Sequence, residues 1–229
     1  MPDHTLSFSA LLPEGIDAVA RGGIARSQAR LPPALRAVHQ GLLRQFLNQG
    51  EGPTAASVAD LARQHGLDPD ASLTALAAAD LVHLNSAGNQ VEIAYPLSAV
   101  PSQHRVDIHN GPSLTAMCAI DALGVPLMSN AAATIVSHTP STGQQIQVTR
   151  ERDGHWHWEP ATTVVVLATA TCTGRIAYAC QHTEFHAAHE EAEKYLTGSA
   201  LQQGLVLTQD QALTVAKTEF GPLLRPDSR

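Results

Sequence analysis

The 229-residue sequence predicts an α+β protein: an N-terminal winged-helix-like module of three helices, then a mixed, mostly antiparallel sheet domain with helices. Two patterns support this class. Apolar residues recur at helical spacing through residues 31–81, whereas short runs rich in β-branched residues, separated by turn signals, dominate after residue 131. The chain is also long enough to bury a sizeable core in one or two domains.

We expect three parts: an N-terminal arm at 1–30, the winged-helix-like module at 31–97 and a larger domain at 98–229. The first residues lack the basic start and unbroken apolar core of a signal peptide. No run approaches the roughly 18 apolar residues of a membrane span. Three cysteines without an export signal do not make a disulfide framework, so we expect a cytoplasmic protein with reduced thiols and no membrane partner.

The first module begins with helical patterns at 31–50, 54–66 and 68–81. Gly50 is a suitable stop for the first helix, Thr54 or Ser57 can cap the second, and Asp68 can cap the third. Residues 82–97 then indicate two short strands around a Ser-Ala-Gly-Asn turn.

Three helices and a hairpin form the shape of a DNA-binding winged helix, with the third helix in the major groove. The charges argue against that function, because phosphate contacts need lysine and arginine. The net charge is −7, and Arg63 is the single basic residue between 54 and 84. Four aspartates share that stretch: Asp60, Asp68, Asp70 and Asp80. We therefore expect a structural module and no nucleic-acid partner.

In the second part, residues 98–111 are expected to join the two parts, and a helix is expected to contain 114–128. The sequence "HWHW" at 155–158 indicates an exposed hairpin arm with Trp156 and Trp158 on one side. Strands are predicted at 132–139, 144–150, 162–170 and 175–185, and helices at 190–198 and near 208–220.

Cys118 and Asp121 are the first candidates for chemistry. Residues three apart share a helix face, so both side chains can point into one cavity. A thiolate is a nucleophile and a ligand for soft metals, and a neighbouring carboxylate can accept or deliver a proton. The spacing alone also fits a buried structural cysteine followed by a surface aspartate.

Several segments, in this order, resemble the organomercurial (alkylmercury) lyase family: "YPLSAVPSQHRV", "LTAMCAIDALGVPLM", "VSHTPSTGQQIQVT" and "WEPATTVVVLA". The resemblance covers about residues 30–224. Members cleave carbon–mercury bonds by protonolysis, with two cysteines that hold mercury and an aspartate that passes a proton to carbon. The resemblance implies that Cys118 is the first thiol and Asp121 the proton shuttle. Mercury would be part of a small-molecule substrate, and no nicotinamide, flavin or nucleotide cofactor is implied.

The second thiol departs from the family pattern. Alignment places Ala179 where the family has its second catalytic cysteine, and Cys180 one position later. On a regular strand this shift turns the side chain to the opposite face, away from Cys118. A bulge at Cys180, or recruitment of Cys172, could restore the pair. We take Cys118, Asp121 and Cys180 as the candidate catalytic residues, with Cys118 and Cys180 as mercury ligands.

Alternation in the same stretch offers another metal set. Cys180, His182, Glu184 and His186 would share one face of a regular strand and could bind zinc or copper. An ordinary strand with one face in solvent shows the same alternation, so the pattern alone does not establish a zinc or copper site.

Three functions remain open on the sequence. The chain could be an alkylmercury lyase, an enzyme of the same fold that uses Cys118 and Asp121 on a small organic molecule, or a non-catalytic metal-binding homologue. The deciding feature is whether a second thiol faces Cys118. The oligomeric state stays open.

Overall fold

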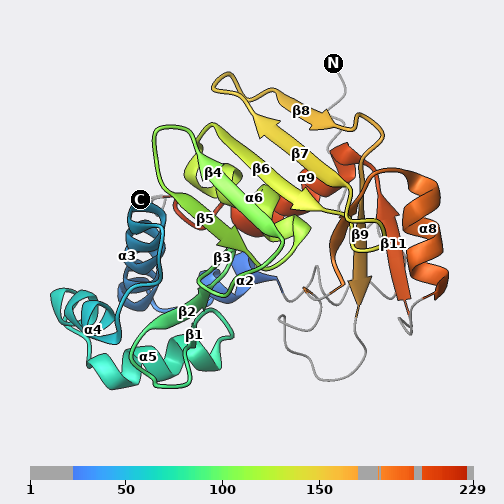
Figure 1. Cartoon of the computed structure of the whole chain (residues 1–229). Helices are drawn as coiled ribbons and strands as arrows, with labels where there is room; N and C mark the ends of the chain where they lie inside the picture. The colour runs from blue at the N-terminus through green and yellow to red at the C-terminus, as the bar shows by residue number, and fades with distance from the viewer. Residues whose placement is uncertain (1–22, 170–179, 181, 199–202, 226–229) are drawn as a thin grey trace, which may run out of the picture.

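The computed structural model describes residues 23–169, 180, 182–198 and 203–225 (Figure 1). Helices pack on two separate sheets, and every strand pair in the described residues is antiparallel. The predicted α+β class is therefore confirmed. None of the helices in the described part of the chain is both long and apolar enough to cross a membrane.

The N-terminal helices begin and end largely where the sequence predicts. The Thr54 hydroxyl accepts a hydrogen bond from the amide of Ser57 at 3.1 Å, and Asp68 caps the next helix through the amide of Ala71 at 2.8 Å. Gly50, at φ 78°, ends the long helix. The helices are α2 (Ile24–Ala29), α3 (Pro33–Gln49), α4 (Ala55–Gln64) and α5 (Pro69–Ala78).

Helix α2 lies within the range 1–30 predicted as an N-terminal arm, and its residues Ile24 and Gln28 are buried. The Gln28 amide contacts Nδ1 of His39 at 2.8 Å and donates to the carbonyl of Leu223 at 3.1 Å. Apolar burial and these long-range hydrogen bonds hold the helix in place, and a short sequence segment does not reveal such contacts.

The large sheet links the two predicted parts of the chain. Its strand order is β1-β2-β3-β5-β4-β6-β7-β8, so the hairpin β1–β2 continues through β3 into the later strands (Figure 1). The sheet therefore crosses the domain boundary predicted at residue 97. The division of the chain into domains stays a prediction. The strands are β1 (His83–Leu84), β2 (Val91–Ala94), β3 (Leu97–Ser98), β4 (His104–Ile108), β5 (Ser113–Ala116), β6 (Ala133–His138), β7 (Gln145–Arg150) and β8 (Trp156–Glu159).

Two of these strands differ from the sequence expectation. Strand β4 lies in the segment predicted to be a connection, and β5 takes the start of the helix predicted over 114–128. Leu114 and Ala116 are buried while the residues next to them are more exposed, as strand alternation requires. In the sequence, an apolar run at these four residues fits a strand as well as a helix. They form a strand because β5 pairs with β4.

The small sheet has the order β10-β9-β11, and α8 (His189–Gly198) packs beside it (Figure 1). Its strands are β9 (Val164–Thr169), β10 (Glu184–His186) and β11 (Gln203–Leu207). The strand predicted at 175–185 lies largely outside the described residues. Strand β11 had no counterpart among the predicted strands.

Helix α6 (Ala119–Ser129) forms the centre of the core. It packs against β4 and β5 on one side and against α9 (Gln209–Phe220) on another, and most of its residues are buried (Figure 1). Gly124 permits the close approach of α9, because an added Cβ would lie 2.1 Å from Cδ2 of Phe220. The position of α6 fixes where its N-terminus, and therefore Cys118, lies.

We predict that Gly124→Ala lowers the free energy of unfolding by about 1–3 kcal/mol, because the methyl group must displace the Phe220 ring. Urea denaturation measures this loss. The control is Gly198→Ala in α8, where an added Cβ meets nothing within 4 Å; it should leave stability unchanged or slightly raised. A Gly124→Ala protein as stable as the wild type would contradict the close α6–α9 contact.

Candidate active site

Cys118 occupies the N-cap position of α6. Its backbone is extended, at φ −150° and ψ 173°, and its Sγ accepts a hydrogen bond from the amide of Asp121 at 3.4 Å. Serine, threonine, asparagine or aspartate usually fills this role. A sulfur at this point faces the free amides and the positive end of the helix dipole, both of which favour the thiolate over the thiol.

Asp121 joins two thiols. Its Oδ2 lies 3.2 Å from Sγ of Cys118 and 3.5 Å from Sγ of Cys180. The three-residue spacing places Cys118 and Asp121 on one side of the first helical turn, as the sequence indicates. One carboxyl oxygen can therefore exchange a proton with either sulfur.

Cys180 lies beside Asp121 and within 4.8 Å of Cys118, so the direction that a regular strand would give its side chain does not apply. The amide of Thr183 donates to the carbonyl of Cys180 at 3.2 Å, so the chain turns here and strand β10 begins only at Glu184. Because Cys180 has helical conformation and precedes the strand, strand alternation does not set its direction. The amide of Ala119 donates to the carbonyl of Thr183 at 2.9 Å, which ties this turn to the start of α6. Ala179 and Cys172 lie outside the described residues.

The ligand atoms of Cys118, Asp121 and Cys180 all lie within 4.8 Å of one another, and the three side chains are 3%, 3% and 5% exposed. Within the described ranges, no other set of three or more histidine, cysteine or acidic residues is close enough to hold a metal ion. The alternative set with His182, Glu184 and His186 is therefore not assembled. Instead, Glu184 contacts His104, while His182 and His186 contact Tyr195.

Burial controls the protonation of the cluster. It raises the pKa of Asp121 to about 7, although hydrogen bonds from both thiols favour the charged carboxylate. Burial, the hydrogen bond with Cys180 and the charge of Asp121 raise the pKa of Cys118 well above its usual value. The hydrogen bond with Cys118 lowers the pKa of Cys180, but burial and Asp121 outweigh it and raise that pKa to about 11. Near neutral pH the free site holds two thiols beside a carboxyl group that exchanges its proton easily.

Tyr95, between β2 and β3, lies fully buried near this cluster. Burial raises its pKa far above the usual value, and the negative charges of Cys180 and Asp121 add to the effect. The sequence does not indicate this proximity, because Tyr95 precedes Cys118 by 23 positions. A residue from the predicted N-terminal module therefore contributes to the surroundings of the site.

A buried polar network anchors the strand that follows the Cys180 turn. Nε2 of His104 lies 3.0 Å from Oε2 of Glu184, and Nδ1 of His104 lies 2.8 Å from Oγ of Ser137. The side chain of Gln103 also donates to Glu184. These contacts connect β10 to β4 and β6 of the large sheet, so they restrain the strand directly after the turn. Strand alternation in the sequence made Glu184 a possible metal ligand, whereas the structure pairs it with His104.

Removing one partner of this network should destabilise the fold. We predict that His104→Leu lowers the free energy of unfolding by about 3–5 kcal/mol, because it leaves the buried Glu184 carboxyl group without its imidazole partner. The double variant His104→Leu/Glu184→Leu should recover most of this loss in urea denaturation. Arg105→Leu, at the exposed ion pair with Asp107, is the control and should cost about 0–1 kcal/mol. Equal losses in the His104 and Arg105 variants would contradict a structural role for the network.

The raised pKa of Asp121 should also appear in the pH dependence of stability. The folded state binds the Asp121 proton more tightly than the unfolded state, whose pKa is near 3.8, so the contribution of this group to stability falls as pH rises from about 4 to 7. Asp121→Asn should reduce the slope of the free energy of unfolding against pH by up to about 1.4 kcal/mol per pH unit. Urea titrations at several pH values measure it, with Asp70→Asn controlling for the loss of an exposed carboxyl group. Identical wild-type and Asp121→Asn slopes would contradict the shift.

Comparisons with known proteins show which proteins this chain is similar to. The family model MerB, described as alkylmercury lyase, matches residues 97–221. The alkylmercury lyase of Staphylococcus epidermidis (strain ATCC 12228 / FDA PCI 1200) is 29% identical over 156 residues, which cover 68% of this chain and 71% of that protein. The alkylmercury lyase of Bacillus cereus is 28% identical over 156 residues, with 68% and 70% covered.

The same fold occurs in the crystal structure of the mercury-bound form of MerB2. That structure aligns with a TM-score of 0.71 and 22% identity, over 91% of this chain and all of the other. The family model spans more than half of the sequence and includes both Cys118 and Cys180. This protein therefore belongs to the alkylmercury lyase family and is a lyase.

Proposed function

We propose that this enzyme cleaves the carbon–mercury bond of small organomercurials by protonolysis, with Cys118, Asp121 and Cys180 as its catalytic residues. One observation supports this most directly: a single buried carboxyl oxygen lies between two buried sulfurs, at 3.2 Å and 3.5 Å. The reaction needs two soft ligands for mercury and one proton carrier beside them.

The chemistry of the donor set fits mercury. Thiolates select soft cations over the hard ions that oxygen ligands prefer. If a mercury–sulfur bond is close to a zinc–thiolate bond in length, two such bonds span at most about 4.6 Å. The sulfurs of Cys118 and Cys180 lie within 4.8 Å of each other, so one metal ion can bind both with little movement.

In the first step, Cys118 displaces the ligand X of a substrate R–Hg–X. The sulfur–mercury bond forms, the mercury–X bond breaks, and the thiol proton departs with X. The N-terminal amides of α6 stabilise the negative sulfur during this exchange, and the amide of Asp121 already points at it.

In the second step, Cys180 binds the same mercury and its proton passes to Asp121. Asp121 then protonates the carbon of R as the carbon–mercury bond breaks, which releases R–H and leaves mercury bound to two sulfurs. The two thiol protons are thus accounted for: one leaves with X and the other ends on carbon. A pKa of about 7 suits Asp121 to both accepting and donating this proton near neutral pH.

The alternative of an enzyme that uses one thiol and one carboxyl group on another organic substrate depended on the loss of the second thiol. Cys180 lies beside Asp121 in the described structure, so that argument no longer applies.

The test is benzene release from phenylmercuric acetate in the presence of excess small thiol. We predict that Cys118→Ser, Cys180→Ser and Asp121→Asn each lower the rate by about 10³-fold or more, because they remove one sulfur ligand or the proton carrier. Headspace gas chromatography measures benzene. Cys172→Ser is the matched control, since it removes the third cysteine of the chain and should retain activity.

Two results would overturn the assignment. A folded wild-type protein that binds the mercurial without releasing benzene is not a lyase for this bond. Full activity in Cys180→Ser together with loss in Cys172→Ser would give the role of second thiol to Cys172.

A further inference from the structure

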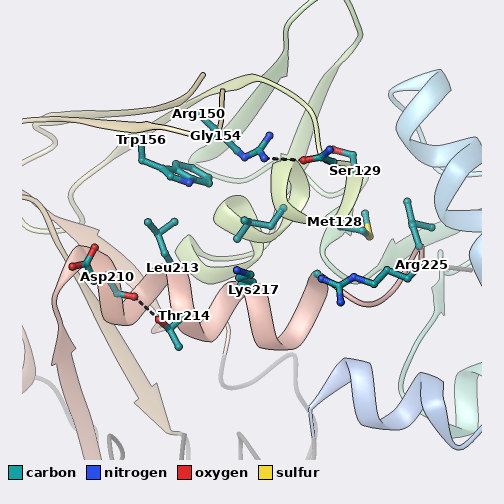
Figure 2. A pocket seen from close by; sticks show the side chains of 14 residues that line it. Met128, Ser129, Arg150, Gly154, Trp156, Asp210, Leu213, Thr214, Lys217 and Arg225 are labelled. Atoms are coloured by element: carbon teal, nitrogen blue, oxygen red, sulfur yellow. Dashed lines mark hydrogen bonds between the residues drawn. The ribbon is translucent and has the colours of Figure 1, made fainter. Parts of the chain in front are cut away.

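A cavity lies at the other end of α6 from Cys118. It measures about 930 Å³ and is bounded by the C-terminal turn of α6, by β7 and β8, and by α9 with the residues that follow it (Figure 2). A helix of this length separates the two ends by about 16 Å. Pockets for small ligands commonly have volumes of about 300–1,000 Å³. Nothing in the proposed lyase reaction uses this cavity.

Positive charge gathers in the cavity although the whole chain carries a net charge of −7. Arg150, Lys217 and Arg225 line it, against Asp210 as the one acidic residue of the lining. Arg150 is held in place, because its guanidinium donates to the carbonyl of Ala131 at 2.7 Å and to Oδ1 of Asn130 at 2.9 Å. This leaves further guanidinium N–H groups for a ligand.

Among the described residues, Lys217 and Arg225 have no ion-pair partner. In the part of the chain that the structure describes, the side chains of Lys217 and Arg225 form no ion pair and no hydrogen bond, and both residues are exposed. Figure 2 shows Lys217 and Arg225 on the same side of the cavity, with Asp210 at the opposite end of α9. The cavity is therefore polarised along α9, and an anion is favoured at the Lys217 end.

Apolar side chains form the adjoining walls. Trp156 projects from β8 on one side and Leu213 from α9 on the other, and both are partly buried (Figure 2). An indole ring favours stacked or edge contacts with another aromatic ring. The cavity thus combines a place for a flat apolar body with cations that can bind a carboxylate.

We propose that this cavity binds a small aromatic carboxylate, with its ring between Trp156 and Leu213 and its carboxylate at Lys217 and Arg225. Arg150 defines the upper rim, and Asp210 disfavours the reversed orientation by like-charge repulsion. The site does not depend on the proposed lyase function, because it shares no residue with the thiol cluster.

The test uses the full-length protein without mercury and 2-naphthoate as the probe. Isothermal titration calorimetry and the NMR shift of the Trp156 indole N–H should both report saturable one-site binding in the range up to about 1 mM. The neutral isostere 2-naphthamide should bind at least about 10-fold more weakly, because it lacks the charge. Higher salt should weaken binding of 2-naphthoate, since the cations are exposed.

The decisive variants are Lys217→Gln and Arg225→Gln, each expected to weaken 2-naphthoate binding by about 10-fold while the folded spectrum is retained. Lys194→Gln is the matched control: it removes a lysine of α8 that already pairs with Glu190 at 3.1 Å, and it should not alter binding. The proposal fails if no saturation is seen up to about 10 mM, if the amide binds as tightly as the acid, or if Lys217→Gln binds like the wild type.

Discussion

The hydrogen bond from the amide of Asp121 to Sγ of Cys118 is the contact on which the site depends. It makes a cysteine the cap of the most buried helix in the described structure, so that folding of the core and placement of the reactive sulfur are one event. The apolar contacts of α6 with the large sheet and with α9 stabilise this arrangement, and at Gly124 the two helices approach so closely that a Cβ would overlap the Phe220 ring. Because the cap belongs to a rigid helix, Asp121 follows three residues later in a fixed direction.

Burial has two effects at this site. It excludes water from the two sulfurs and the carboxyl group, and it raises the cost of charge on each of them. In the free enzyme near neutral pH both sulfurs are protonated, whereas Asp121, with a pKa of about 7, is partly ionised and can accept a proton from a thiol. Desolvation therefore favours a substrate that carries its own positive centre. The proton that must reach carbon can be held by Asp121, whose carboxyl oxygen lies close to both sulfurs.

The second sulfur depends on contacts far from the first in sequence. The turn at Cys180 is joined to α6 through the amide of Ala119 and to the large sheet through Glu184 and His104. Tyr95, from the early part of the chain, lies close enough for its pKa to respond to the charges of Cys180 and Asp121. The continuous sheet that carries β1 to β8 brings these segments together, which gives the N-terminal helices and hairpin a structural connection to the site.

Local chemistry in the sequence determined the helix caps at Thr54 and Asp68, the one-sided placement of Cys118 and Asp121, and the α+β class, because each depends on neighbours within a few residues or on simple periodicity. The start of α6, the strands β4, β5 and β11, and the burial of α2 were decided by tertiary structure. In these segments pairing and packing with distant residues outweigh weak local preferences. Cys180 shows the difference most clearly: residue counting along an assumed strand directed its sulfur away from Cys118, whereas a single turn, held by a hydrogen bond to α6, directs it toward Asp121.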